Sequence, residues 1–214
     1  MRPAEIVPAA QAQPLPGDGT LDPAGADLTE WKVPGQCDAS ALHPIGPDAF
    51  LFAVDENNSL RSWSAVAGVR EWANLHSLVE GAGVSLSDRE IDIEAVAALE
   101  DRLLWIGSHG LNRRGRERPN RRLLLATSLP GSTGAGTLRG QPVDLLPALL
   151  DHPELTPLLT PLFAPGQPVP PKKGGLNIEA LASDGQALLV GLRSPLDDEG
   201  RALLLGLGNP LPLL

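Results

Sequence analysis

The chain has 214 residues, a formal net charge of −9 at pH 7 and a hydrophobic share of 42%, with a pI near 4.9. The acidic balance argues against nucleic-acid binding, which needs a cationic surface. The single cysteine excludes an internal disulfide, and no apolar run reaches the roughly 18 residues of a membrane span. The N-terminus lacks the continuous apolar segment of a secretory signal, so we expect a soluble cytoplasmic protein without a membrane partner.

Residues 1–28 are rich in proline, alanine and glycine and show little hydrophobic periodicity. This composition predicts a flexible N-terminal segment. The remaining residues, 29–214, are enough for one sizeable core, and we expect them to form a single domain.

Short apolar segments separated by turn residues follow along the chain. They predict strands at Ala49–Val54, Leu60–Ser64, Ala95–Leu99, Leu103–Gly107, Leu123–Thr127, Ile178–Leu181, Ala187–Leu192 and Ala202–Leu207. Many short strands with Gly, Pro and Asp turns indicate an all-β sandwich, barrel or propeller. Two segments interrupt the pattern. The glycine-rich residues 128–142 predict a flexible surface loop, and residues 143–163 combine helically spaced leucines with prolines, which predicts a short helical insertion.

Residues 92–107 and 177–191 repeat one pattern. Each has an Asp or Asn followed by Ile-Glu-Ala, then a turn and a second apolar strand, and residues 38–54 hold a fainter copy. An internal repeat of about 45 to 50 residues is typical of propeller blades. Three units are fewer than the usual 4–8 blades. We therefore expect a β-propeller-like fold that is partial or unusually small.

Several strings within these repeats belong together. They include Cys37–Ala41, Asp55–Asn57, Asp92–Ala95, Trp105–Gly110, Arg118–Arg121, Gly174–Ala182, Gly191–Pro195, Gly200–Ala202 and Asn209-Pro210. Their order and content resemble a bacterial family known as domain of unknown function 3616, itself similar to phytase-like and esterase-like propellers. The resemblance covers residues 37–210 and implies a β-propeller-like fold without a particular activity. Ala95 and Ala180 stand where the family usually has glycine, and we expect the family pattern to continue past residue 214.

Three acidic or polar pairs occupy corresponding places in the repeats. They are Asp92 with Glu94, Asn177 with Glu179, and Asp38 with Ser40. Strand side chains alternate between faces, so each pair is expected to share a face and to point toward a central axis. Such a ring of oxygens suits Ca²⁺, with Asp92, Glu94 and Glu179 as metal ligands and Asn177 as a further ligand-binding residue. The same ring could supply an acid and a base for hydrolysis, or the acids could cap turns and form ion pairs.

His109 and Arg193 each follow a repeat glycine by two residues. If both face the axis, they complete a candidate catalytic set with Glu94 and Glu179, in which His109 and a glutamate exchange a proton. The alternative is a histidine held in a loop by hydrogen bonds.

The segment 113–122 carries six arginines and one opposing acid, Glu117. Arginine binds phosphate in a bidentate manner, so Arg118 and Arg121, with Asp55 nearby, are candidates for binding a small anionic ligand. Alternatively, both arginines are structural and pair with acids such as Asp55 or Glu56.

These patterns specify an architecture better than a reaction. We expect a binding protein with a ligand or cation on the central axis. The alternatives are a calcium-dependent, phytase-like phosphoesterase and an interaction scaffold without a small-molecule site. Three blades leave open sheet edges, which predicts a homodimer that pairs them.

Overall fold

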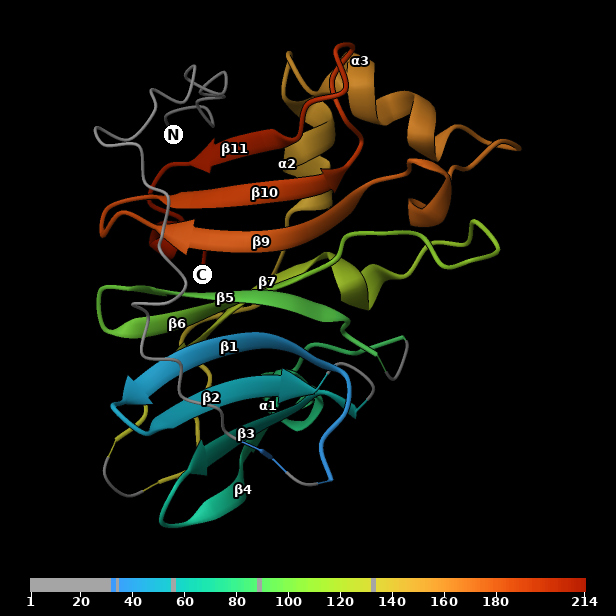
Figure 1. The fold of residues 1–214 in the computed structure, drawn as a ribbon. Coiled ribbons are helices and arrows are strands. Elements are labelled where there is room, and N and C mark those ends of the chain that lie inside the picture. The colour runs from blue at the N-terminus through green and yellow to red at the C-terminus, as the bar shows by residue number, and fades with distance from the viewer. Residues whose placement is uncertain (1–31, 34, 55–56, 88–89, 132–133) are drawn as a thin grey trace, which may run out of the picture.

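The computed structural model describes residues 32–214 except residues 34, 55–56, 88–89 and 132–133. The predicted flexible segment 1–28 and Asp55 lie outside the described residues. The protein is all-β, with three antiparallel sheets and a few short helices (Figure 1). Each sheet is built from strands that are consecutive in the chain, and several neighbouring strands are joined by short Gly, Asp or Asn turns.

The first sheet has the strand order β1-β2-β3-β4. Its strands are β1 (Ala39–Gly46), β2 (Ala49–Val54), β3 (Ser59–Ser64) and β4 (Gly68–Asn74). Helix α1 (Leu75–Gly81) follows directly, and the side chain of Asn74 caps it by accepting a hydrogen bond from the Ser77 amide at 3.1 Å. The sequence pattern did not predict β4 or α1, since polar residues interrupt the apolar alternation there.

The second sheet has the order β5-β6-β7-β8 and the third has the order β11-β10-β9. Their strands are β5 (Ile93–Leu99), β6 (Arg102–Gly107), β7 (Leu123–Ser128), β8 (Val143–Asp144), β9 (Asn177–Ser183), β10 (Leu188–Ser194) and β11 (Leu203–Leu207). The 3₁₀ turn η2 (Pro119–Arg122) precedes β7, and two more, η4 (Pro171–Lys173) and η5 (Leu211–Leu213), lie before β9 and after β11.

The predicted helical insertion is present, and along the chain it lies between the second and third sheets. It consists of α2 (Leu146–Asp151), α3 (Thr156–Leu159) and the 3₁₀ turn η3 (Thr160–Phe163). Each piece has a proline in its first turn, where the missing amide hydrogen costs nothing, and the next proline ends the preceding piece. This alternation explains why the leucine-rich segment forms several short helices instead of one long helix.

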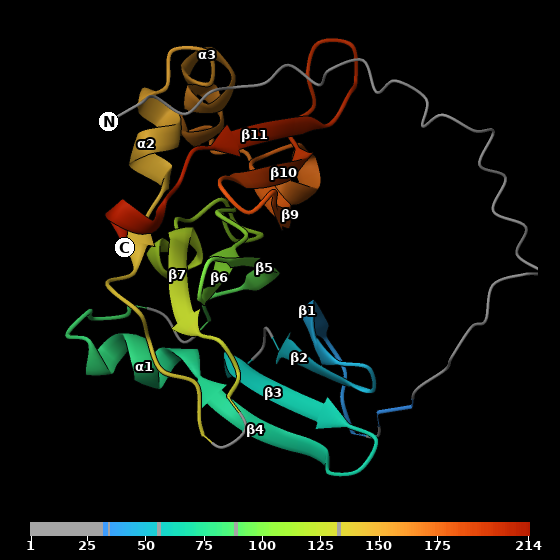
Figure 2. The same ribbon diagram turned by 90° about the vertical axis from the view of Figure 1, so that its left-hand side faces the viewer.

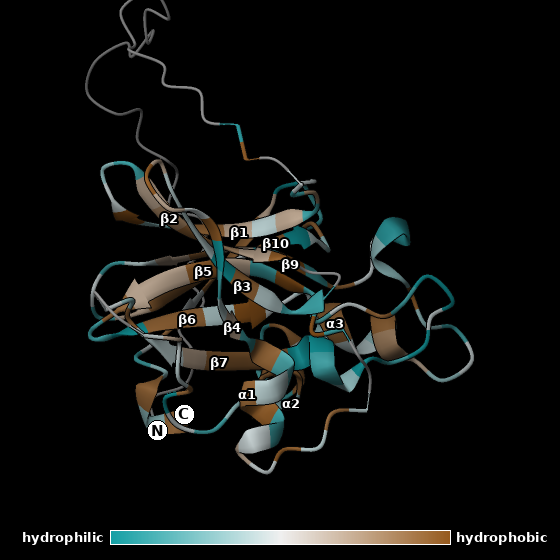
Figure 3. Cartoon of the chain, turned by 90° about the horizontal axis from the view of Figure 1, so that it is seen from below, coloured by the Kyte–Doolittle hydropathy of each residue, from teal (hydrophilic) through white to brown (hydrophobic). Residues whose placement is uncertain are grey.

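The three sheets stack in chain order and spread like a fan from their first strands (Figure 2). β1 lies beside β5, and β5 lies beside β9. The second sheet is therefore buried on both faces. Its buried strands are brown in the hydropathy view, whereas teal residues gather mainly in the loops (Figure 3). Trp105 and Leu125 join the core shared with the first sheet, while Leu104 and Ile106 join the core shared with the third.

The glycine-rich segment is mostly exposed where it is described, and it is anchored to neighbouring strands at a few residues. The Gly136 amide donates to the Trp72 carbonyl oxygen at 2.9 Å, and Leu138 forms an isolated bridge with Thr127. The small glycine is required because a Cβ at residue 136 would lie 2.5 Å from the Trp72 ring. No helix in the described part of the chain is long and apolar enough to cross a membrane.

Candidate functional site

Each sheet has an irregularity at the start of its first strand. In β1 the pairing with β2 shifts between Ala39 and Ala41, and in β5 the pairing with β6 shifts between Ile93 and Ala95. In β9 the pairing with β10 skips from Ile178 to Ala180. The extra residues are Ser40, Glu94 and Glu179. These are β-bulges, which re-aim side chains and are frequent beside functional sites.

The three bulges lie at the same end of the molecule. The Asn58 side chain, in the turn that follows β2, accepts a hydrogen bond from the Ile91 amide at 2.8 Å. The Ser108 carbonyl oxygen, just after β6, accepts one from the Ile178 amide at 2.8 Å. These bonds connect the starting ends of β1, β5 and β9. Residues from the three repeats therefore reach one region.

Glu94, Glu179 and Arg193 form what we call the exposed cluster, and Asn177, which is only 6% exposed, contacts it. An Arg193 Nη1–Glu179 Oε1 contact of 2.7 Å joins side chains that are 61% and 40% exposed. The Asn177 amide donates to the same carboxylate oxygen at 2.8 Å. Glu179 chiefly, and Glu94 as well, raise the pKa of Arg193. The guanidinium therefore lies within the field of both carboxylates.

Asp92 does not belong to this cluster. It precedes β5, its φ is 58°, and it is only 8% exposed. The predicted alternation, which placed Asp92 and Glu94 on one face, does not extend to residue 92 because the left-handed backbone and the bulge intervene. Asp38 has the same backbone sign, with φ of 58°.

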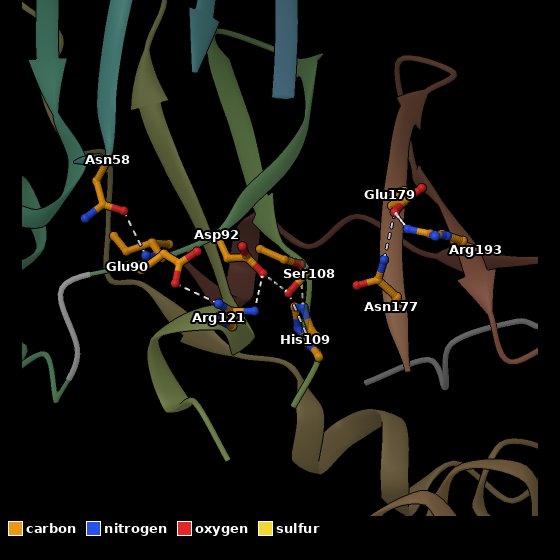
Figure 4. A network of polar contacts seen from close by, with 12 residues as sticks. Asn58, Glu90, Asp92, Ser108, His109, Arg121, Asn177, Glu179 and Arg193 are labelled. Atoms are coloured by element: carbon orange, nitrogen blue, oxygen red, sulfur yellow. Dashed lines mark hydrogen bonds and ion pairs between the residues drawn. The ribbon is translucent and has the colours of Figure 1, made fainter. Parts of the chain in front are cut away.

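Asp92 instead lies in what we call the buried cluster, with Ser108, His109 and Arg121, and the partly exposed Glu90 borders it. Arg121 Nη1 lies 2.9 Å from Asp92 Oδ2 and its Nη2 lies 2.7 Å from Glu90 Oε2. The Ser108 hydroxyl donates a short hydrogen bond to the same Asp92 oxygen. Figure 4 shows this cluster and the Glu179–Arg193–Asn177 group as separate sets of side chains.

Burial is the largest influence on the titration of Asp92 and of His109. It raises the pKa of Asp92 to about 6, although Ser108 and Arg121 act in the opposite direction. Burial also lowers the pKa of His109 to about 4. His109 is 1% exposed and has φ of 59°. Its Nδ1 lies 2.8 Å from the Gly107 carbonyl oxygen, and among the described residues nothing bonds its Nε2. A neutral ring that donates from Nδ1 fits these contacts.

His109 and Arg193 therefore have different surroundings in spite of their matching sequence positions. His109 is enclosed in the buried cluster, whereas Arg193 lies on the surface. The structure brings Glu94 and Glu179 close to Arg193, but it places His109 beside Ser108 and Arg121 (Figure 4). A proton-transfer role for His109 with either glutamate remains a prediction.

The arginine-rich segment is partly structural. Arg121 pairs with Asp92 and Glu90, and Arg122 lies 3.0 Å from Asp144. Asp55 and Glu56, the partners expected from sequence, lie outside the described residues. Arg118 is half-buried at the start of η2, and its place in an anion site remains a prediction.

Two asparagines that were not among the predicted site residues, and the repeat glycine Gly107, support the buried cluster. Asn58 and Asn120 are each 3% exposed and accept hydrogen bonds from the amides of Ile91 and Ser87, respectively. They fix the segment that leads into Asp92. A Cβ on Gly107 would clash with the Arg121 carbonyl oxygen, so only glycine lets η2 approach β6. The sequence did hold a sign of their importance, because Gly107 and Asn120 lie in the strings that carry the family resemblance.

The described residues contain no group of three or more His, Cys, Asp or Glu side chains arranged to hold a metal ion. Glu94 and Glu179 provide two carboxylates, and Ser40 provides a buried hydroxyl without a partner in the described part of the chain. These are oxygen donors, the type that Ca²⁺ prefers.

Three stacked antiparallel sheets, each opening on a bulged first strand, define an all-β protein with a polar cluster at one end of its sheets. The chain belongs to the family described as protein of unknown function (DUF3616), whose model matches residues 38–129 and 130–208. This confirms the family resemblance. None of the curated proteins matches the chain at a significant level.

Proposed function

We propose that the three sheets are consecutive blades of a propeller-like fold, and that the protein is a binding module. Its ligand is a small cation held where the first strands begin. The observation that carries this proposal is the set of three bulges, which presents Ser40, Glu94 and Glu179 from adjacent strands. Three oxygen-bearing side chains at corresponding places favour a shared ligand over unrelated surface positions.

The charge of the exposed cluster supports a cation as the ligand. Two carboxylates and one guanidinium leave a net negative charge, and the whole chain carries −9. Arg193 serves as the resident counter-ion of Glu179. A divalent cation entering between the glutamates must displace it, because like charges repel at this separation.

Calcium binding measured by isothermal titration calorimetry tests the proposal. Glu94→Gln and Glu179→Gln should each abolish the binding heat, because each removes a charged ligand. Arg193→Gln should strengthen calcium binding, because it removes the competing cation. The Arg201–Asp197 pair offers a matched control. Its contact is also 2.7 Å and its arginine is 66% exposed, so Asp197→Asn should leave the affinity for calcium unchanged.

Two results would refute a cation site. One is the absence of calcium binding in both the parent and Arg193→Gln. The other is binding of phosphate, in place of calcium, that disappears in Arg193→Gln. The second result would favour the small anionic ligand, with Arg193 as its contact.

We do not extend the proposal to hydrolysis. A general acid or base must come within hydrogen-bond reach of the reacting group. His109 is buried, and its Nδ1 is engaged by the Gly107 carbonyl oxygen. Binding without turnover is therefore the function that the geometry supports best.

A further inference from the structure

The third sheet exposes an apolar face on the side away from the second sheet. Register places Ala180 beside Gly191 and Leu204, and Ala182 beside Leu189 and Gly206. We call these six residues the outer leucine face. Leu189 is 39% exposed and Leu204 is 49% exposed. A Cβ on Gly191 would touch the Ala180 and Leu204 side chains, which confirms that the row shares one side.

The opposite side of the same strands is core. Ile178, Val190 and Leu205 are at most 2% exposed and pack against the second sheet. The third sheet therefore has one apolar face that is covered and one that is open. None of these six residues is charged, and an exposed apolar face of this kind marks an interaction surface.

The second sheet shows what normally covers such a face. In the same register positions it carries Ala95 opposite Ile106 and Ala97 opposite Leu104. These four residues are at most 8% exposed, because the third sheet packs on them. The outer leucine face is the corresponding surface of the next sheet along the stack. Its chemistry fits another sheet.

The other end of the stack offers a complementary surface. In β1, Ala41 packs toward the second sheet, so Leu42 points away from it. Leu42 is 59% exposed and lies opposite Phe52. Phe52 clusters with Val54 and Trp63, and these three side chains are already buried, so Leu42 is the exposed part of this side. This is the side of the first sheet that, in the second and third sheets, receives the preceding sheet.

We propose that a second copy of this chain covers the outer leucine face with the Leu42 side of its own first sheet. This contact would continue the sheet-on-sheet interfaces inside the chain, because the third sheet would meet a first sheet as the second sheet meets the third. Two copies arranged in this way make two such contacts and close a ring of six sheets. Six lies within the 4–8 blades of typical propellers, and closed symmetry is the usual state of homo-oligomers.

The proposal rests on the propeller-like arrangement proposed above, but it does not depend on the ligand site. Calcium binding and self-association are measured separately. A dimer without calcium binding would leave this inference intact, and a calcium-binding monomer would refute it while leaving the binding function in place.

Light scattering coupled to size-exclusion chromatography provides the first test. The parent chain should elute at about 45 kDa, twice the 22.4 kDa of one chain. Leu204→Arg should raise the dimer dissociation constant by about 30-fold or more, because it buries an unpaired charge in the contact. Leu129→Arg is the matched control, since Leu129 is 41% exposed but follows β7 in the second sheet. Circular dichroism melts verify that both variants fold.

A mixing experiment distinguishes this head-to-tail contact from a symmetric contact of two outer leucine faces. Leu42→Glu should also dissociate the dimer. When it is mixed with Leu204→Arg, association should return. The mixed pair has one unaltered contact, whereas each variant alone has an introduced charge in both contacts. A monomeric parent, a dimer that tolerates Leu204→Arg, or a mixture without recovery would each overturn the proposal.

Discussion

His109 and Asp92 should impose opposite pH dependences on stability, and substitution should separate them. The pKa of His109 is about 4 in the folded protein, against its ordinary value of 6.5. Its stabilising contribution is therefore complete above pH 6.5 and is lost as the pH falls toward 4, because the unfolded chain takes up the proton first. The difference corresponds to roughly 3 kcal/mol.

For Asp92 the sign is reversed. Its pKa is about 6 in the folded protein and ordinarily 3.8. As the pH rises from 3.8 to 6, the unfolded chain releases the proton before the folded protein does, so folding becomes less favourable. This difference is also roughly 3 kcal/mol. Between pH 4 and 6 the two contributions nearly cancel in the parent protein.

Urea unfolding at intervals from pH 4 to 7.5 tests this balance. Asparagine tolerates the positive φ of both positions, so His109→Asn and Asp92→Asn are suitable variants. Relative to the parent, His109→Asn should lose stability as the pH rises from 4 to 6, and Asp92→Asn should gain it. The difference in unfolding free energy between each variant and the parent should therefore change with pH. If it varies by less than about 0.5 kcal/mol over the whole pH range, the assignment of buried groups with shifted pKa values is refuted.

Three further substitutions test the core and the close approach of η2. Trp105→Ala should lower the free energy of unfolding by about 3–5 kcal/mol, because the ring is fully buried and its indole donates to the Thr127 hydroxyl at 2.9 Å. Arg121→Gln should cost about 3–5 kcal/mol in urea melts, because it leaves a buried carboxylate unpaired. Gly107→Ala should lower the melting temperature by several degrees, because its Cβ would lie 2.8 Å from the Ile91 carbonyl oxygen.

Exposed positions provide the contrast for these three. Arg113→Gln, in the same arginine-rich segment, should change stability by less than about 0.5 kcal/mol. A loss below about 1 kcal/mol for Trp105→Ala would contradict the packing of β6. Arg121→Gln with unchanged stability and a lost response to added phosphate would indicate a ligand role for this arginine instead.

Local patterns were enough to predict most strands. Strands β5 and β6 lie where the sequence predicted them. The alternation in β5 and the apolar run of β6 were sufficient, because hydrophobic periodicity indicates which side chains of a strand are buried. Strand β4 was not predicted, because Arg70 and Glu71 lie within it and interrupt the alternation of apolar and polar residues. The family resemblance required order and content across the whole chain, and the family match confirms it.

The candidate site was less accessible to sequence reasoning. An alternating pattern of apolar and polar residues does not reveal a β-bulge, so it could not show that Glu94 and Glu179 are the extra residues of two bulges. Likewise, the pairing of Asp92 with Arg121 depends on how η2 folds back on β6. Such partners are set by tertiary structure and not by spacing.

The order of the sheets along the chain has a consequence for protein synthesis. Consecutive strands pair with their neighbours, so the first sheet is complete in sequence once residue 74 has left the ribosome, and such local contacts form quickly. The second sheet cannot close in the same way. Asp92 is translated before Arg121, and a buried carboxylate without its partner is unfavourable. We expect the ends of β5 and β6 near Asp92 to remain unpacked during translation until η2 has left the ribosome.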